Sequence, residues 1–186
     1  MQTNVFWVPG PWPGRLGIVP RPRGGDWLAD ETKSWRQAGI DRVISLLERD
    51  EEGHLDLEGE AEAAAASGVE FTSFPIPDRG IPASGDSAAE LVSGVVDALE
   101  RGRTVAVHCR QGIGRSALIT GAVLVAEGQD VFTALRTIKE SRGLDVPETA
   151  EQRQWLSKFA SRLTREPAAH HHAAPDGRQK GVIGRG

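Results

Sequence analysis

The apolar and polar residues of the chain alternate between the spacing of strands and that of helices. Short β-branched or apolar runs predict strands at 5–8, 16–19, 42–47, 70–76 and 104–108. Apolar residues at three- and four-residue intervals predict helices at 28–38, 57–67, 87–102, 115–127, 131–141 and 147–163. Strands and helices therefore alternate over much of the chain, and the run TVAVH at 104–108 is typical of a strand in the middle of a covered sheet.

The ends of two predicted helices carry further signals. Ser87 and Glu90 have the spacing of a capping box and predict the start of the helix at 87–102. The helix at 115–127 is apolar nearly all round, which indicates central burial, and Gly128 stands as its C-cap.

The last two helices are amphipathic. The helix at 131–141 is predicted to bury Phe132, Leu135 and Ile138. Pro147 is predicted to open the final helix, whose apolar residues recur every four positions at Trp155, Phe159 and Leu163. The pattern stops after Arg165, so we expect one folded domain over 1–166 and a disordered tail over 167–186.

Composition fits one domain with its own core. The chain has 186 residues, of which 39% are hydrophobic and 26% charged. Its four N-terminal tryptophans, at positions 7, 12, 27 and 35, are expected to pack against that core. A net charge of -4 argues against nucleic-acid or anionic-membrane partners. The longest apolar run, 118–126, is about half a membrane span, and no signal peptide follows Met1, so we expect a soluble, cytoplasmic protein.

The chain has a single cysteine, Cys109. One cysteine excludes an internal disulfide and a multi-cysteine zinc site, which leaves a buried structural thiol or a reactive nucleophile. Its neighbours decide between these two roles.

The segment HCRQGIGRS, at 108–116, lies between the predicted buried strand and the buried helix. A loop with two glycines that enters a helix can turn successive backbone N–H groups inward, which creates a nest for a phosphate-sized dianion. The same field favours a thiolate at Cys109. Arg115 can return to the rim and bind two phosphate oxygens with its planar fork, and Ser116 can donate to the sulfur when it becomes the leaving group. The loop residues expected to surround the phosphate are Arg110, Gln111, Gly112, Ile113 and Gly114.

The pattern His108-Cys109-x5-Arg115-Ser116 resembles the signature of cysteine-dependent protein tyrosine phosphatases. The glycine placing in Cys-x-x-Gly-x-Gly-Arg-Ser is similar to that of the compact dual-specificity members of the kinase-associated phosphatase type. The resemblance covers roughly residues 16–163. It implies a single α/β domain with a central mixed, mostly parallel sheet and helices on both faces. It also implies phosphoryl transfer through a cysteinyl-phosphate without a metal or other cofactor, and a His108 side chain that hydrogen-bonds the Cys109 backbone and shapes the loop. The alternative for His108 is a core histidine at the strand end; in either role we expect it to be buried, without a part in proton transfer.

Such a phosphatase needs a general acid from a separate loop. Asp78, in the sequence PDRGIP, lies at an interval before Cys109 that suits the compact members, although Pro-Asp-x-Gly is also an ordinary turn sequence. Asp86, its nearest rival, is interpreted as a helix cap beside Ser87. In related phosphatases a glutamine beyond the catalytic helix orients the hydrolytic water, and Gln152 matches that position.

Other interpretations explain less of the sequence. The pattern G-x-G-x-x-A at 112–117 also fits a dinucleotide-binding fingerprint, but helical periodicity follows where a second strand is required. An arsenate reductase needs more cysteines, and a rhodanese gives no reason for Arg115, Ser116 and Asp78. A catalytically silent phosphoprotein-binding module stays open as the alternative, though thiol, arginine and acid are all present. The histidines at 170–172 have no partners for a metal site and are assigned no function.

The loop also bears on the substrate. Phosphatases that act on polyphosphorylated inositides carry lysines in this loop, whereas positions 111 and 113 here are Gln and Ile. We therefore expect a phosphorylated protein or other phosphomonoester as the partner. Phosphotyrosine is the first candidate, with phosphoserine or phosphothreonine accommodated by a shallow pocket.

Overall fold

The computed structural model describes residues 3–165. The predicted tail at 167–186, with its three histidines, lies outside the described residues, as does residue 166. No helix within 3–165 is long and apolar enough to cross a membrane.

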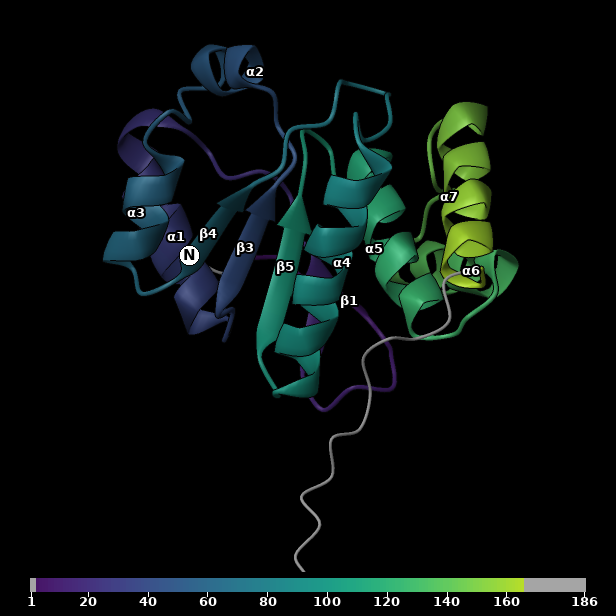
Figure 1. The fold of residues 1–186 in the computed structure, drawn as a ribbon. Helices are drawn as coiled ribbons and strands as arrows, with labels where there is room; N and C mark the ends of the chain where they lie inside the picture. Colours follow the sequence, from purple (N-terminus) through teal and green to yellow (C-terminus); the bar gives the residue numbers. More distant parts are fainter. Residues whose placement is uncertain (1–2, 166–186) are drawn as a thin grey trace, which may run out of the picture.

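A five-stranded mixed sheet forms the centre of the molecule, with the strand order β1-β2-β5-β3-β4 (Figure 1). The strands are β1 (Phe6–Val8), β2 (Arg15–Ile18), β3 (Arg42–Ser45), β4 (Glu70–Ser73) and β5 (Thr104–His108). β1 pairs antiparallel with β2, and the other three pairings are parallel. The mixed, mostly parallel sheet implied by the resemblance is confirmed, and TVAVH is its middle strand.

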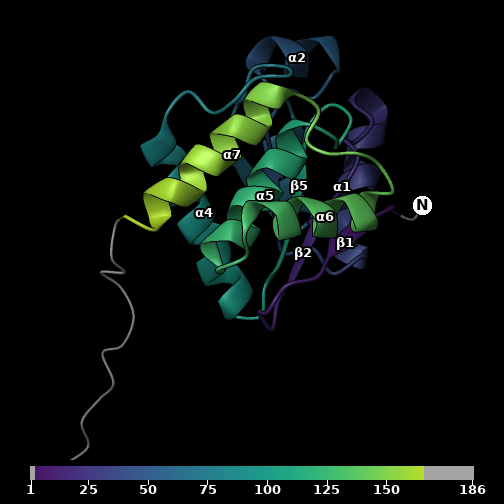
Figure 2. The ribbon, with the colours of Figure 1, turned by 90° about the vertical axis from the view of Figure 1, so that its right-hand side faces the viewer.

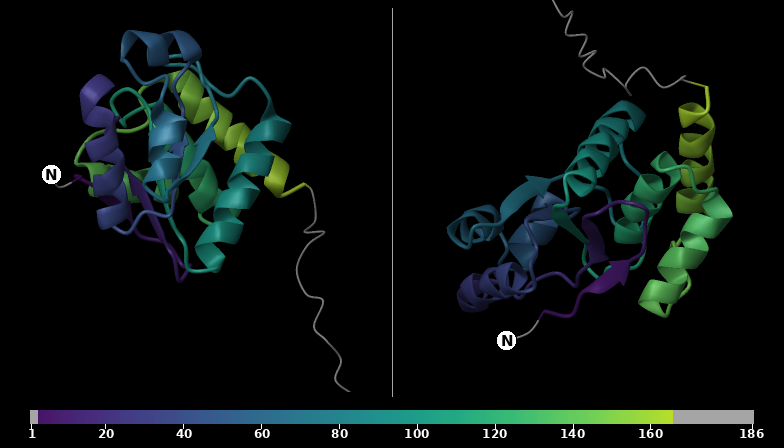
Figure 3. Two further views of the ribbon diagram at one scale, coloured as in Figure 1. Left: turned by 90° about the vertical axis from the view of Figure 1, so that its left-hand side faces the viewer. Right: turned by 90° about the horizontal axis from the view of Figure 1, so that it is seen from below.

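Helices cover both faces of this sheet. They are α1 (Leu28–Gln37), α2 (Arg49–His54), α3 (Glu60–Ala66), α4 (Gly85–Glu100), α5 (Arg115–Ala126), α6 (Val131–Arg142) and α7 (Ala150–Leu163), with a short 3₁₀ turn η1 (Gly25–Trp27) before α1. α1 and α3 lie on one side, and α4 to α7 lie on the other, as the view from below shows (Figure 3). α5 is central in its layer, surrounded by α4, α6 and α7 (Figure 2), and every residue from Arg115 to Val125 is buried. The predicted central burial of this helix is confirmed.

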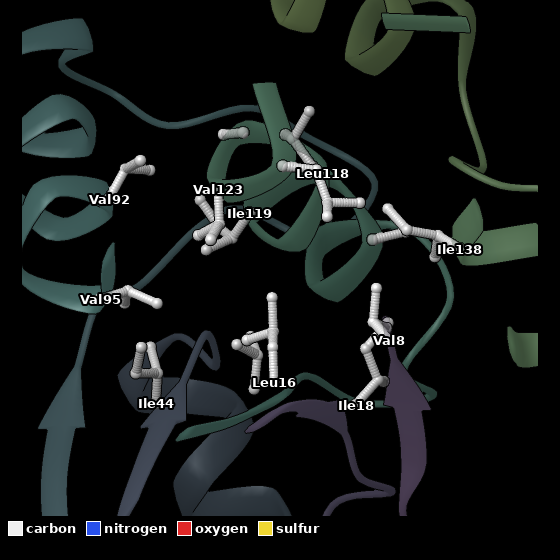
Figure 4. Packing of buried hydrophobic residues seen from close by; sticks show 14 of the residues in the cluster. Val8, Leu16, Ile18, Ile44, Val92, Val95, Leu118, Ile119, Val123 and Ile138 are labelled. Atoms are coloured by element: carbon white, nitrogen blue, oxygen red, sulfur yellow. The ribbon is translucent and has the colours of Figure 1, made fainter. Parts of the chain in front are cut away.

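The alternation of side chains along the strands divides the core into two clusters. Val105 and Val107 of β5 point toward α4 and α5, while Ala106 between them points toward the α1 side, where Trp35 is fully buried. The larger cluster joins the sheet residues Val8, Leu16, Ile18 and Ile44 to the helix residues Val92, Val95, Leu118, Ile119, Val123 and Ile138 (Figure 4). Burial on both faces explains why β5 is apolar throughout.

Two predicted helix starts are wrong. α4 begins at Gly85, because the Ser84 hydroxyl accepts a hydrogen bond from the Ser87 N–H (3.2 Å) and so acts as the N-cap. Asp86 is therefore not a cap; it lies in the first turn and pairs with Arg162 of α7 (2.5 Å).

Pro147 does not open the last helix. It lies in the preceding loop, and α7 starts at Ala150 behind a capping box. In this box Gln152 donates its N–H to the Thr149 hydroxyl, and the Thr149 N–H donates to Gln152 Oε1, both at 3.2 Å.

Two aromatic residues predicted to be buried are exposed. Phe132 is 74% exposed, because α6 turns Ala134 and Ile138 toward the core and leaves Leu135 only partly buried. Trp27 is 56% exposed, with the Arg23 guanidinium 4.3 Å from its ring centre. The sequence analysis also did not predict α2, a short polar helix at the C-terminal ends of the strands.

Candidate active site

The loop between β5 and α5 surrounds the only cysteine. Cys109 is 3% exposed, and its Sγ accepts a hydrogen bond from the Gly112 N–H at 3.2 Å. Gly112 has φ +66°, and a Cβ at this position would lie 3.1 Å from Ile18 Cγ2, so glycine is needed both for the backbone turn and for the space. The buried Ser116 hydroxyl has no hydrogen-bond partner within the described residues. The loop thus turns a backbone donor toward the sulfur and keeps a free hydroxyl at the start of α5.

Arg142, at the end of α6, supports this loop from outside. Its Nε donates to the Gly112 carbonyl at 2.8 Å, and its Nη2 donates to the Gln111 carbonyl at 3.4 Å. The guanidinium also lies over the Phe6 ring, 3.8 Å from its centre. Burial lowers the pKa of Arg142, while the nearby Cys109 acts in the opposite direction. Sequence reasoning did not identify this contact, because it joins segments that are distant along the chain.

Arg115 is only 2% exposed and is held by acceptors from other loops. Its Nη1 donates to the carbonyls of Ile76 (3.0 Å) and Leu46 (3.3 Å). The two Nη atoms bind the Glu51 carboxylate as a fork, at 2.5 and 2.9 Å, and Nη2 also contacts Asp78 Oδ1 at 3.1 Å. This geometry fixes the plane of the guanidinium beside Cys109.

Glu51 is a site residue that the sequence analysis missed. It lies on α2, where the Glu48 N–H donates to its Oε2 at 3.0 Å as part of a capping box. Burial raises the pKa of Glu51, but the hydrogen bonds from Arg115 and from the Glu48 N–H outweigh it, so the pKa lies below its ordinary value. The spacing Glu48-x-x-Glu51 was the only available signal for the helix that carries this carboxylate.

Asp78 reaches the same site from the segment after β4. A hydrogen bond from the Gly80 N–H to the Pro77 carbonyl (2.8 Å) closes a tight turn, and Arg79 within it has φ +59°. The Asp78 N–H donates to Glu48 Oε2 (3.3 Å), and the Asp78 side chain, 58% exposed, contacts Arg115. Asp78 does belong to a turn, but its carboxylate is directed to Arg115.

Gln152 is fully buried in the first turn of α7. Its Nε2 donates to the Gly80 carbonyl at 2.9 Å, while its Oε1 takes part in the capping box. A Cβ added at Gly114 would lie 3.1 Å from that Oε1, so Gln152 borders the cysteine loop as well as the turn that carries Asp78.

His108 is buried as expected, but it takes the alternative role of a core histidine and does not support the Cys109 loop. No hydrogen bond joins its ring to the Cys109 backbone within the described residues; its Nε2 instead lies 2.8 Å from Glu60 Oε1, next to the Trp35 ring. The reason is the strand alternation, which points His108, like Ala106, to the α1 and α3 side of the sheet.

Cys109, Arg115 and Asp78 share one pocket of about 310 Å³. Its lining comprises Asp78, Cys109, Arg110, Gln111, Gly114, Arg115 and Glu148. Of the loop residues predicted to surround a phosphate, Gly112 and Ile113 are not among them, and Ile113 packs against the core. A larger cleft of about 950 Å³ is lined mainly by the N-terminal segment and the end of α1. Its lining contains neither cysteine nor histidine, so the chemistry points to the smaller pocket. Within 3–165 no cluster of His, Cys, Asp or Glu is arranged to hold a metal ion.

The chain is similar in sequence to known proteins. Residues 19–129 match the family described as "polymorphic toxin system, DSP-PTPase phosphatase". Cyclin-dependent kinase inhibitor 3 from Rattus norvegicus is 25% identical over 138 residues, covering 73% of this chain and 65% of that protein. The Homo sapiens protein of the same name is 23% identical over 154 residues, covering 82% and 70%. The chain thus spans about two thirds of the length of these relatives.

Solved structures share the fold. A kinase-associated phosphatase with its catalytic cysteine replaced by serine superposes with a TM-score of 0.80 at 20% identity, covering 92% of this chain and 99% of that one. The active form of Tk-PTP gives a TM-score of 0.68 at 27% identity, covering 80% and 93%. The family match includes Asp78, Cys109 and Arg115, and it ends before Gln152.

Proposed function

The chain belongs to the DSP-PTPase phosphatases of polymorphic toxin systems, a group of cysteine-dependent dual-specificity protein tyrosine phosphatases, and from this premise we propose that it hydrolyses phosphomonoesters through a cysteinyl-phosphate intermediate without a metal. The observation that carries the proposal is the convergence of Cys109, Arg115 and Asp78 on one polar pocket.

In the first step the Cys109 thiolate attacks the phosphorus, and the bond from phosphorus to the leaving oxygen breaks. Arg115, whose plane Glu51 fixes, binds the phosphoryl oxygens together with loop N–H groups. Asp78, in its protonated form, gives its proton to the leaving oxygen, because an unprotonated alkoxide or phenoxide leaves poorly.

In the second step water attacks the phosphorus and the sulfur–phosphorus bond breaks. The Asp78 carboxylate accepts a proton from the water, which restores its protonated form. The Ser116 hydroxyl donates to the departing sulfur, a role that suits its position at the start of α5 with no protein partner among the described residues. Gln152, beside Gly114, retains the predicted role of orienting the water.

The proposed substrate is a protein phosphotyrosine, with phosphoserine or phosphothreonine as further substrates. The cations that line the pocket are Arg110 and Arg115, and Glu148 adds a carboxylate at its edge, which favours one phosphate over several. We also propose a cytoplasmic location, because a reducing compartment protects a thiolate nucleophile from oxidation.

Hydrolysis of an aryl phosphate tests this function. The wild-type chain should turn over the ester, and Cys109→Ser should not, although it should still bind vanadate because Arg115 and the loop N–H groups remain. Ser93→Ala, an exposed change on α4, serves as the matched control and should keep full activity. Binding of a phosphotyrosyl peptide without turnover by the wild type would instead identify a silent recognition module.

A further inference from the structure

We propose that Gln152 is a positioning residue for the first chemical step, because it holds the acid loop, defined here as residues 77–82, against the end of α7. This inference rests on the proposed phosphatase function. This role of Gln152 differs from orienting the hydrolytic water, because placement of the acid matters before the cysteinyl-phosphate forms.

The exposed tip of the acid loop has few contacts besides the bonds of Asp78 to Glu48 and Arg115. Pro77, Asp78 and Arg79 are exposed, and the Gly80 N–H to Pro77 carbonyl bond closes the turn. Arg79 occupies the left-handed region at φ +59°, a conformation that is unfavourable for a residue with a Cβ. A turn of this kind keeps its shape only when its surroundings hold it.

Gln152 supplies that support from the interior. Its Nε2 donates to the Gly80 carbonyl at 2.9 Å, across 72 positions of sequence. The capping-box bond from the Thr149 N–H to Oε1 fixes which end of the amide faces the loop. Because the side chain is fully buried, water does not compete readily for this bond.

The helix that carries Gln152 is itself anchored to the helix that carries Arg115. α7 packs along α5, where Leu156 fills the space above Gly121, so that a Cβ there would lie 3.0 Å from Leu156 Cδ2. The hydrogen bond to Gly80 therefore couples the acid, two residues earlier, to the same rigid unit as the phosphate-binding arginine. Correct placement of a general acid depends on such coupling.

A second contact between the same segments is weaker. Arg79 and Glu148 form an ion pair at 3.6 Å with side chains that are 65% and 38% exposed. Exposed pairs of this kind contribute little because solvent screens them. Of the two contacts between this end of α7 and the acid loop, we therefore assign the main restraint to Gln152.

The two roles of Gln152 separate kinetically. The ratio kcat/KM reports the steps up to formation of the cysteinyl-phosphate, whereas kcat also includes its hydrolysis. A residue that places Asp78 affects kcat/KM, and it does so only for leaving groups that need a proton. A residue that orients water affects hydrolysis of the intermediate and leaves kcat/KM unchanged.

Two variants test the restraint. Gln152→Glu keeps the oxygen of the capping box but loses the donor to Gly80, and Gln152→Met removes both. Each should lower kcat/KM for a phosphotyrosyl peptide by roughly five- to tenfold, the effect of one lost hydrogen bond. Neither should change kcat/KM for 2,4-dinitrophenyl phosphate, whose leaving group needs no proton.

Two control variants exclude indirect effects. Gln154→Met places the same change on the exposed face of α7 and should leave both substrates unaffected. Thr149→Ala removes the N-cap hydroxyl but retains the Gly80 bond, so it should lower stability without the leaving-group dependence.

Hydrogen exchange of the acid-loop amides gives a readout that needs no turnover. Amides at 78–81 should exchange faster in both Gln152 variants than in wild type or Gln154→Met. If the wild type has no activity, the proposed function fails while this measurement still decides whether Gln152 holds the loop. Unchanged exchange, a loss confined to kcat, or the same kcat/KM pattern in Thr149→Ala would each overturn the inference.

Discussion

The bidentate contact between Glu51 and Arg115 predicts that Glu51→Gln destabilises the protein as well as its active site. The side chains are 8% and 2% exposed, so solvent screens the pair very little. The amide of glutamine can accept one of the two bonds from Arg115, but its NH₂ group faces the second guanidinium donor. One charge-assisted hydrogen bond is therefore replaced by a contact between two donors.

The expected cost follows from these contacts. Removing one partner of a buried ion pair costs about 3–5 kcal/mol. Glutamine keeps one bond, and Asp78 with the carbonyls of Leu46 and Ile76 still contacts Arg115, so we expect about 2–3 kcal/mol here. For a chain of this size, that corresponds to a fall in Tm of about 4–12 °C.

The effect should depend on pH in a defined direction. The folded-state pKa of Glu51 is lowered, so its contribution is fully present above the ordinary carboxyl pKa of about 4.3 and is lost as the pH falls through the folded value. The difference in Tm between wild type and Glu51→Gln should therefore be largest near neutral pH and shrink below about pH 4.

The adjacent residue provides a matched control. Burial, and secondarily Glu60, raises the pKa of Glu52, so its charged form opposes folding at neutral pH. Glu52→Gln should consequently stabilise the protein at pH 7, with a gain that disappears in acid. Thermal unfolding followed by circular dichroism at several pH values measures both variants. A Glu51→Gln protein whose Tm equals that of wild type at pH 7 would refute the assignment of Glu51 as the anchor of Arg115.

Two further predictions concern α6. Arg142→Lys should lower kcat/KM for an aryl phosphate about fivefold without unfolding the chain, because an ammonium cannot donate to Gly112 and Gln111 with the same geometry. Unchanged kinetics would show that this contact does not shape the cysteine loop. Phe132→Ser should leave the free energy of unfolding, measured in urea, within about 0.5 kcal/mol of wild type, because the ring is 74% exposed. A loss of stability several times larger would show that Phe132 belongs to the core.

The parts of the site that are local in sequence were predictable. Cys109, Arg115 and the glycines between them lie within one short segment, and its position between a buried strand and a buried helix follows from the apolar pattern. The mixed, mostly parallel sheet also agrees with the resemblance drawn from that segment, and the burial of α5 agrees with its apolar pattern.

The parts that depend on tertiary contacts were not predictable. Glu51 contacts Arg115 across 64 positions, and its polar helix has no apolar periodicity to reveal it. Ser84 and Ser87 are both residue types that suit an N-cap. Ser84 takes this role because its backbone is extended and its hydroxyl accepts the Ser87 N–H. Phe132 fits the apolar spacing of α6, but the packing of Ala134 and Ile138 decided which face is buried.

The partners of Arg115 have a consequence for how the chain folds. Its side-chain acceptors lie 37 to 69 positions earlier in the sequence. Such long-range contacts form only after large loops have closed, whereas α5 can form through local contacts. During refolding from denaturant, phosphate binding should therefore return later than the helical signal, together with the completed sheet. Recovery of binding measures the assembly of the whole domain rather than of its catalytic segment.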